Sequence, residues 1–281
     1  MTDSRQTVAV IIPVRDRMQL LGRALDSVLA QLRPPDEIVV VDDGSVDGSA
    51  ELVKQRYPGV KLLVQAPAGV SAARNRGIAG SNSDWLAFLD SDDAWHPDKL
   101  QRQLTALSQR PSMKICHCDE IWLRNGRRVN PMRKHARYGG WVFERCLPLC
   151  CISPSTALVH RDVFASVGVF DETLPACEDY DLWLRVSARF PVLYLDEKLA
   201  TRWGGHADQL SARYPAMDRF RVKALEKVLL PGTLQPRWRR AAAAEARRRL
   251  DILAGGSERR GRMQEACAFR TRAAELGRYQ R

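Results

Sequence analysis

Apolar and amphipathic segments alternate along the first third of the chain. Four runs are wholly or mostly apolar: Val8–Val14, Glu37–Val41, Val60–Val64 and Trp85–Leu89. Such runs are typical of strands that are buried on both faces of a parallel sheet. Between them, apolar residues at helical spacing predict helices over Met18–Leu32, from Asp47 onward and over Val70–Ala79. Because strand and helix trade places at this spacing, the pattern predicts an α/β domain with a doubly wound, mostly parallel sheet.

The rest of the chain mixes strands and helices less regularly. The pattern predicts a helix over Asp98–Leu107, a strand over Met113–Leu123 that turns at Asn125-Gly126, a strand over Thr156–His160, a short helix after Arg161 and a helix over Glu178–Ala188. Three helical stretches follow from Met217, the second ending at Gly255-Gly256 and the third starting at Ser257. We therefore expect a domain of residues 1–208 and an α-helical C-terminal region of residues 209–281.

Acidic residues follow two of the predicted strands. In doubly wound sheets ligands bind beyond the carboxyl ends of the strands, so Pro13–Asp16, Asp42–Ser45 and Asp90–Asp93 should meet at one crevice. The carboxylates of Asp90–Asp93 would repel one another unless a cation lay among them. Oxygen ligands suit Mg²⁺ or Mn²⁺, with a diphosphate supplying further oxygens. Acidic turns are also common in ordinary loops, and this motif alone is weak.

Two other acidic segments have a structural and a functional interpretation. In the first segment, a turn followed by a helix cap accounts for the presence of Gly44 and Ser45. It does not account for the two carboxylates of Asp42 and Asp43, and one of them could bind a uracil imide or ribose hydroxyls. Acidic residues in Glu178–Asp181 suit the first turn of a helix whatever its function. A sugar transfer with inversion also needs one carboxylate to remove the acceptor's proton.

Five segments, in this order, resemble one known family. They are Val8–Val14, Val40–Gly48, Gly69–Asn75, Phe88–Asp93 and Glu178–Trp183, and together they span about residues 8–205. The chain resembles the inverting family-2 glycosyltransferases with the fold called GT-A. Five motifs in the right order are more specific than any one of them.

The resemblance implies roles for individual residues. Pro13 and Asp43 would line the nucleoside pocket, Asp90 and Asp92 would form the D-x-D motif with Asp92 closest to a Mn²⁺ or Mg²⁺ ion, and Asp179 would act as the base. Arg74 would hold the diphosphate or the D-x-D loop. The other residues assigned to the nucleotide-sugar site are Val14, Arg15, Ser91, Trp95 and Glu178. His206 lies where relatives offer a metal or phosphate ligand, although a lone His beside glycines is more often a loop residue.

Tryptophans need a separate comparison, because sugars stack on aromatic faces whereas buried Trp usually packs the core. Trp95, next to the D-x-D loop, is the candidate for stacking. We assign Trp141, Trp183 and Trp238 to packing.

Charge is unevenly placed along the chain. The formal net charge is +11, and residues 209–281 carry 18 Lys/Arg against 7 Asp/Glu, which is the whole excess. Such a region could meet anionic lipid, nucleic acid or an acidic protein, or could be a solvated helical face. The absence of a Walker loop and of an RNA-module pattern makes nucleic acid the weakest of these partners.

The cysteines and the hydropathy of the chain indicate its cellular compartment. The seven cysteines are odd in number and contain no C-x-x-C pair, which favours a reducing compartment. The sequence shows neither a signal-peptide core nor a stretch of about 18 or more apolar residues that could span a membrane. We expect a cytoplasmic protein, with the basic tail attached peripherally to the membrane face.

The resulting functional prediction is a metal-dependent, hexosyltransferase-like enzyme. It would move a sugar from a nucleoside-diphosphate sugar, expected to be a UDP-sugar, to a hydroxyl of a glycan, a lipid-linked precursor or another acceptor in polysaccharide synthesis. One alternative is an inactive protein of the same fold that binds membrane or nucleic acid through its tail. Another is a nucleotidyltransferase, for which Arg15 and Arg17 alone give thin support.

Overall fold

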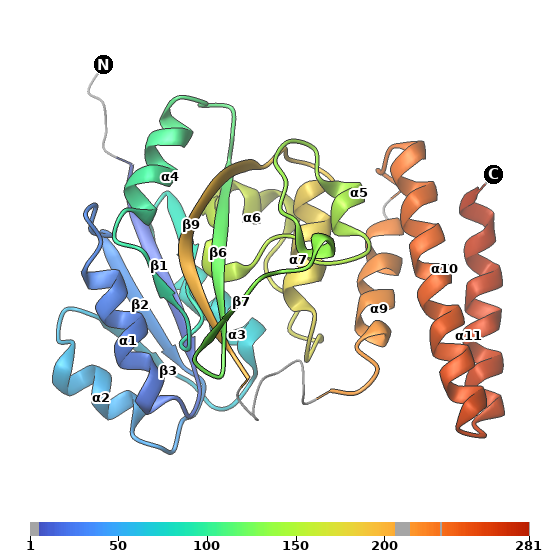
Figure 1. The fold of residues 1–281 in the computed structure, drawn as a ribbon, viewed down its shortest axis with the longest axis horizontal. Coiled ribbons are helices and arrows are strands. Elements are labelled where there is room, and N and C mark those ends of the chain that lie inside the picture. The colour runs from blue at the N-terminus through green and yellow to red at the C-terminus, as the bar shows by residue number, and fades with distance from the viewer. Residues whose placement is uncertain (1–5, 206–213, 231, 281) are drawn as a thin grey trace.

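The structure, a computed structural model, describes residues 6–205, 214–230 and 232–280. In this part of the chain, nine strands form one sheet in the order β3-β2-β1-β4-β8-β6-β9-β5, with β7 paired to β6. Helices pack on the sheet, and the last helices stand beside it, at the right of the view in Figure 1.

The N-terminal half of the sheet is parallel, as predicted. Its strands are β1 (Val8–Val14), β2 (Glu37–Asp42), β3 (Lys61–Val64) and β4 (Trp85–Phe88), and their neighbouring pairs all run parallel. The crossovers are α1 (Met18–Leu29), α2 (Ser49–Arg56) and α3 (Val70–Ala79). The carboxyl ends of these strands therefore share one edge of the sheet.

The central strand β1 is buried on both of its faces. Ala9 and Ile11 belong to one apolar cluster, whereas Val8, Val10 and Ile12 belong to another on the opposite face. On the first face α3 lies so close to β1 that a Cβ atom at Gly77 would stand 2.4 Å from a methyl carbon of Ile11. This close approach fixes the depth at which α3 sits on the sheet.

The other half of the sheet contains antiparallel strands. Its strands are β5 (Ala94–Trp95), β6 (Ile115–Arg124), β7 (Arg127–Val129), β8 (Leu158–His160) and β9 (Leu193–Gly204). The pairs β4/β8, β6/β8, β6/β7 and β5/β9 are antiparallel, and β6/β9 is parallel with register shifts at Asp119. The predicted α/β class is confirmed, with a more mixed sheet than the strand-helix alternation suggested.

Further helices complete the region before residue 205. They are α4 (Lys99–Ser108), α5 (Phe143–Cys146), α6 (Arg161–Val167), α7 (Glu178–Ser187) and the 3₁₀ turns η1 (Arg133–His135) and η2 (Pro154–Thr156). The predicted hairpin at Asn125-Gly126 is present between β6 and β7, with positive φ at both residues.

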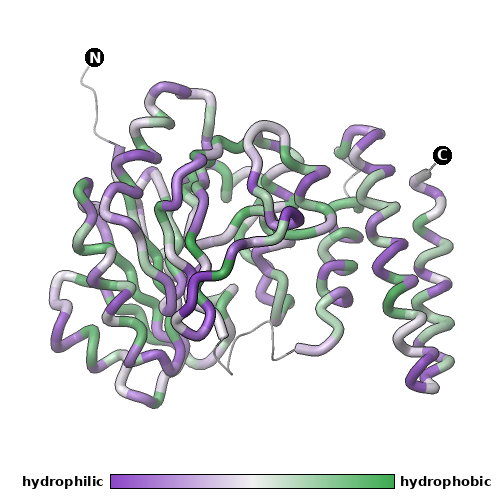
Figure 2. The backbone as a smooth tube through the Cα atoms, in the orientation of Figure 1, coloured by the Kyte–Doolittle hydropathy of each residue, from purple (hydrophilic) through white to green (hydrophobic). Residues whose placement is uncertain are grey.

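The C-terminal region forms α9 (Asp218–Leu229), α10 (Pro236–Arg259), α11 (Met263–Glu275) and the 3₁₀ turn η3 (Leu276–Gln280). The prediction that the second of these helices ends at Gly255-Gly256 is wrong, because α10 continues to Arg259 and α11 begins only at Met263. Glycine costs a helix about 1 kcal/mol relative to alanine, and packing between the two helices offsets that cost. Polar and apolar positions alternate along both helices (Figure 2).

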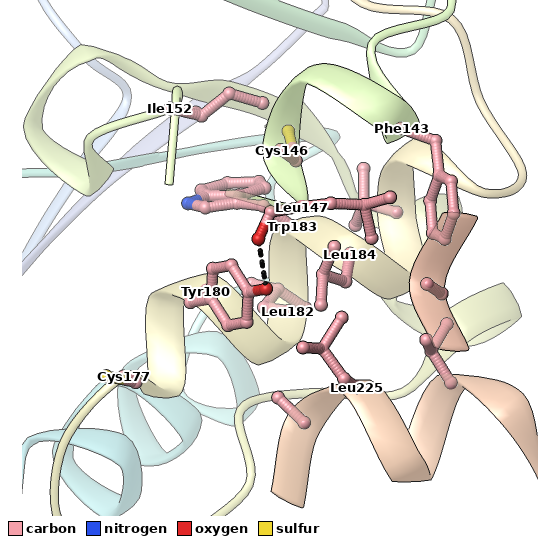
Figure 3. Packing of buried hydrophobic residues seen from close by; sticks show 14 of the residues in the cluster. Phe143, Cys146, Leu147, Ile152, Cys177, Tyr180, Leu182, Trp183, Leu184 and Leu225 are labelled. Carbon is pink, nitrogen blue, oxygen red and sulfur yellow. Dashed lines mark hydrogen bonds between the residues drawn. The ribbon is translucent and has the colours of Figure 1, made fainter. Parts of the chain in front are cut away.

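The C-terminal helices share a core with the preceding domain. One apolar cluster contains Leu182 and Trp183 of α7 together with Val222 and Leu225 of α9 (Figure 3). The buried guanidinium of Arg249 on α10 donates to the carbonyl of Pro148 at 2.6 Å. The boundary at residue 208 stays a prediction, and apolar packing is continuous across it. Within the described ranges, every helix is too short or too polar to cross a bilayer.

Candidate active site

The carboxyl edge of the parallel strands opens into a cleft of about 950 Å³. Its walls come from the ends of β1, β2 and β4, the start of α3, the start of α7, and strands β6 and β9. Most of the residues predicted for the site line this cleft, namely Pro13, Val14, Arg15, Asp43, Arg74, Asp90, Ser91, Asp92, Glu178 and Asp179. Segments far apart in the sequence thus converge at the edge of the sheet where ligands were expected.

Ser155 fixes the acidic loop that follows β4. Its hydroxyl donates to Oδ2 of Asp93 at 2.7 Å and accepts from the backbone N–H of Asp90 at 3.1 Å. The other carboxylate oxygen of Asp93 accepts from the backbone N–H of Trp203 at 3.1 Å. These bonds hold the loop backbone while Asp90 and Asp92 remain at the cleft.

Negative charge is concentrated in this loop. Burial raises the pKa of Asp93 well above its ordinary value, and the neighbouring Asp90 and Asp92 raise it further. The three carboxylates of the sequence pattern D-x-D-D therefore repel one another unless positive charge lies close by.

The residues present fit a divalent cation. One oxygen of Asp90 accepts from Arg74, and about a third of the Asp90 side chain is exposed, at 35%. Among the described residues no group of three or more His, Cys, Asp or Glu side chains encloses a metal position. Two carboxylates are nevertheless what Mg²⁺ and Mn²⁺ usually take from a protein, with water and phosphate completing the shell. His206, the third predicted ligand, lies outside the described residues.

Arg74 joins the acidic loop to α7. Its two terminal nitrogens donate to Asp90 and to Glu178, each at 2.7 Å, and the side chain is only 3% exposed. Glu178 is 104 residues away in the sequence. Burial alone would lower the pKa of Arg74, but Asp90 and Glu178 raise it above its ordinary value. Arg74 thus contacts the D-x-D loop at Asp90, and its predicted contact with a diphosphate stays a prediction.

The start of α7 presents Asp179 to the cleft. Cys177, just before the helix, has a left-handed backbone with φ 63°. This conformation is strained for a residue other than glycine, and such strain persists only where the surroundings impose it. One Asp179 oxygen accepts from the backbone N–H of Tyr180 at 2.7 Å. The Tyr180 hydroxyl donates to the carbonyl of Leu147 at 2.6 Å and anchors the helix (Figure 3).

The opposite part of the cleft contains Asp43. Its oxygens accept from Gln65 at 2.7 Å, from the backbone of Ala68 at 2.7 Å and from the backbone of Gly69 at 2.8 Å. Asp43 therefore shapes the loop before α3, where Gly69 has φ 95°. A carboxylate offers about four acceptor positions, so one is left for a ligand. Pro13 and Val14 lie beside it at the end of β1, and the half-exposed Arg15 approaches Asp16 at 3.9 Å.

Two predictions for tryptophans need correction. Trp95 is 5% exposed and lies in the core, where its indole N–H donates to the carbonyl of Ser155 at 2.7 Å and its ring covers the Lys99 ammonium at 3.9 Å. Its ring is thus used by protein contacts and does not line the cleft. Conversely, Trp141 is 58% exposed and contacts Trp238 with a ring separation of 5.7 Å, so it is a surface residue and not core. Trp183 and Trp238 are buried, as predicted.

A second wall of the cleft was not predicted. It comes from β6, β9 and the segment after β7, and its residues include Glu120, Trp122, Arg137, Arg202 and Trp203. Glu120 accepts from the Trp122 indole at 2.6 Å and pairs with Arg137. Burial opposes ionisation of Arg202, but Glu120, Asp93, Asp90 and Asp179 raise its pKa above the ordinary value. In the sequence, the only local indication of this second wall is the acidic pair Asp119-Glu120, which lies within a predicted strand.

Sequence comparisons agree with the resemblance. The profile of the family described as glycosyl transferase family 2 matches residues 9–168. An uncharacterized glycosyltransferase of Rickettsia bellii (strain RML369-C) is 29% identical over 74% of this chain and 31% of its own length. One of Rickettsia prowazekii (strain Madrid E) is 29% identical over 72% of this chain and 65% of its own length. The chain thus spans less than two thirds of these relatives. The amylovoran biosynthesis glycosyltransferase AmsB of Erwinia amylovora is 29% identical over 73% of this chain and 74% of its own length.

Solved structures show the same fold. S. aureus TarS 1-349 in complex with UDP-GlcNAc matches with a TM-score of 0.74 and 18% identity, over 93% of this chain and 79% of that one. The mannosyltransferase PcManGT from Pyrobaculum calidifontis, in complex with GDP-Man and Mn²⁺, matches with a TM-score of 0.64 and 17% identity, over 99% of this chain and 86% of that one. At these identities the likeness concerns the fold, and it confirms the GT-A prediction.

The Arg74 contacts predict a large loss of stability in Arg74→Met. Because this change leaves the buried Glu178 carboxylate unpaired, the free energy of unfolding should fall by about 3 kcal/mol, read from the denaturant midpoint at unchanged m-value. Arg76→Met, on the exposed face of the same helix, should change it by less than about 0.5 kcal/mol. Adding Glu178→Gln to Arg74→Met should restore part of the loss. Equal stabilities of Arg74→Met and Arg76→Met would contradict this account.

Proposed function

The chain belongs to glycosyl transferase family 2, and from that membership we propose that it is an inverting, hexosyltransferase-like enzyme that moves a sugar from a nucleoside-diphosphate sugar to an acceptor hydroxyl. The observation that carries the proposal is the shared cleft. Asp179 opens onto the same cavity as Asp90 and Asp92, and Arg74 ties the two groups together.

Asp179 is proposed as the base. In a one-step displacement the acceptor hydroxyl must lose its proton as its oxygen attacks, and a carboxylate across the sugar from the leaving phosphate can take that proton. The Tyr180 N–H holds one Asp179 oxygen, which leaves the other for the acceptor. The hydrogen bond from Tyr180 to Leu147 orients the start of the helix that carries this base.

Asp90 and Asp92 are proposed to hold Mn²⁺ or Mg²⁺. When bound, such a cation offsets the negative charge that accumulates on the departing diphosphate. Ser155 and Arg74 position the loop for this task. Arg202 faces the same carboxylates from β9 and is proposed to contact the phosphates.

The donor is proposed to be a UDP-sugar. Pro13, Val14 and the remaining acceptor position of Asp43 would receive the nucleoside at the ends of β1 and β2. TarS, crystallised with UDP-GlcNAc, has the same fold and supports this choice, while PcManGT with GDP-Man and Mn²⁺ supports a role for metal and keeps GDP-sugars as the second candidate.

The acceptor is proposed to be a glycan or lipid-linked precursor at the cytoplasmic face of a membrane. The name of AmsB, a relative in amylovoran biosynthesis, supports a polysaccharide role. Arg240 and Arg259 of α10, Arg260 directly after it and Arg278 of η3 are exposed, and they would meet anionic headgroups. The alternative, an inactive protein that only binds through this region, gives no reason for the carboxylates to converge in one cleft.

Asp179→Asn should abolish transfer while leaving donor binding nearly unchanged, because the amide cannot accept the acceptor's proton. We expect kcat to fall by about 100-fold or more in a sugar-transfer assay. Glu172→Gln, which removes another carboxylate from the lining of the same cleft, is the matched control and should stay within a fewfold of the parent. A normal rate in Asp179→Asn would remove this residue from the mechanism.

A thermal-shift experiment with UDP-, GDP- and dTDP-sugars, each with and without Mn²⁺, tests both the donor identity and the metal dependence of donor binding. A ligand at 100 times its Kd stabilises the folded state by about 2.7 kcal/mol. The UDP-sugars should raise Tm most, and only with Mn²⁺. In Asp92→Asn the metal-dependent part should disappear. Shifts that are identical with and without Mn²⁺ would argue against a metal at Asp90 and Asp92.

Membrane contact is better tested by neutralising charges than by truncation, because α9 shares its core with α7. Changing Arg240, Arg259, Arg260 and Arg278 to Gln should weaken binding to vesicles containing anionic lipid, since each basic residue near such a surface contributes about 1 kcal/mol. The control neutralises four exposed arginines elsewhere, Arg56, Arg110, Arg127 and Arg128. Equal loss in both variants would indicate dependence on net charge only and reject the tail as the contact.

A further inference from the structure

Two cysteines outside the proposed mechanism face each other beside the cleft. Cys146 is the last residue of α5, and its sulfur lies 2.9 Å from the sulfur of Cys151 in the following loop. A disulfide bond is about 2.05 Å long, so the two atoms need to approach by less than 1 Å to be joined. Cys146 and Cys151 are five residues apart in the sequence, and the fold places their thiols in contact while both are free.

The two thiols differ in access. Both belong to the apolar cluster around Trp183, but Cys151, at 8% exposed, lines the cleft, whereas Cys146, at 1% exposed, lies behind it (Figure 3). The hydrogen bond with Cys146 lowers the pKa of Cys151 by more than burial raises it, and Arg137 lowers it as well. Arg137 also donates to the Cys151 carbonyl at 3.3 Å. A reagent in the cleft would therefore meet Cys151 first, with Cys146 behind it.

The sulfurs of the other buried or half-buried cysteines point elsewhere. Those of Cys116, Cys118 and Cys177 are directed at backbone carbonyls at 3.8 to 3.9 Å, and that of Cys150 at the carbonyl of Ile152 at 3.2 Å. The hydrogen bond with Cys151 and burial raise the pKa of Cys146 well above its ordinary value, so contact between the two sulfurs, and not the pKa, distinguishes this pair. Cys267 is exposed on α11.

We propose that Cys146 and Cys151 form a reversible disulfide by exchange with a low-molecular-weight disulfide such as glutathione disulfide. The Cys151 thiolate attacks one sulfur of the reagent, forms a mixed disulfide and releases one glutathione thiolate, which takes up the proton lost by Cys151. Cys146 then loses its proton and attacks the Cys151 sulfur, which expels the second glutathione. The protein loses two hydrogen atoms, which are two protons and two electrons, and the reagent is reduced to two thiols.

The position of this pair gives the disulfide a consequence, which rests on the proposed function. The segment from Cys146 to Ser155 connects both halves of the site. At one end the Leu147 carbonyl accepts from Tyr180, the neighbour of Asp179, and at the other end Ser155 holds Asp90 and Asp93. Drawing Cys151 toward Cys146 shifts the loop between these anchors, and a misplacement of about 1 Å can cost 100-fold in rate. Oxidation thus slows transfer.

The cross-link is tested first without any sugar nucleotide. Full-length protein is incubated with glutathione disulfide, alkylated and digested with trypsin, which releases residues 146–161 as one peptide containing Cys146, Cys150 and Cys151. In Cys150→Ser only the proposed pair remains in that peptide. We expect it to lose two hydrogen atoms and to recover them after dithiothreitol. An unmodified peptide, or glutathione left on Cys151 without closure, would overturn the inference.

The effect on transfer is measured next. Oxidised Cys150→Ser protein should show kcat lowered by about tenfold or more, restored by dithiothreitol, with donor binding largely retained. Cys151→Ser and Cys146→Ala should be insensitive to glutathione disulfide, whereas Cys267→Ser should respond like the parent. A cross-linked protein with an unchanged rate would refute the regulatory part. A cross-link in protein that transfers no sugar even when reduced would count against the proposed function and leave the disulfide site standing.

Discussion

The buried guanidinium of Arg74 is the interaction on which the cleft depends. It reaches from α3 to Asp90 at the end of β4 and to Glu178 at the start of α7, and so connects elements that local folding does not bring together. A charge this deeply buried needs opposite charge close by, and the two terminal nitrogens of Arg74 each have a carboxylate partner. The two carboxylates depend on Arg74 in turn, because without its guanidinium Asp90 and Glu178 would face each other with no positive charge between them.

The remaining electrostatics follow from this arrangement. Asp90, Asp92 and Asp93 concentrate negative charge at one strand end, where Arg74 and Arg202 offset part of it and the proposed divalent cation would offset more. Ser155 meanwhile fixes the loop backbone through two hydrogen bonds. A site built in this way is organised before substrate arrives, which is how electrostatic stabilisation acts most efficiently.

The scaffold explains why these contacts can be held in place. The parallel strands β1, β2 and β4 deliver their carboxyl ends to one edge, while β6 and β9 add a second wall. The helices α7 and α9 share a core, so the start of α7, which carries Asp179, is backed by the C-terminal region. The loop from Cys146 to Ser155 runs between these parts and contacts both, which makes it the place where a local change reaches the whole site.

The sequence by itself determined the parallel half of the fold and most of one wall of the cleft. Periodicity located β1 to β4 and α3, and the rule that ligands bind at strand ends placed Pro13, Asp43 and Asp90 together, because both signals depend on neighbouring residues. Only the tertiary structure decided that Trp95 is core, that Glu120 and Arg202 face the cleft, and that α10 continues through Gly255-Gly256. Each of these features depends on contacts with residues that are far away in the sequence. Long-range packing and charge pairing determine those contacts, and neither produces a periodic pattern along the chain.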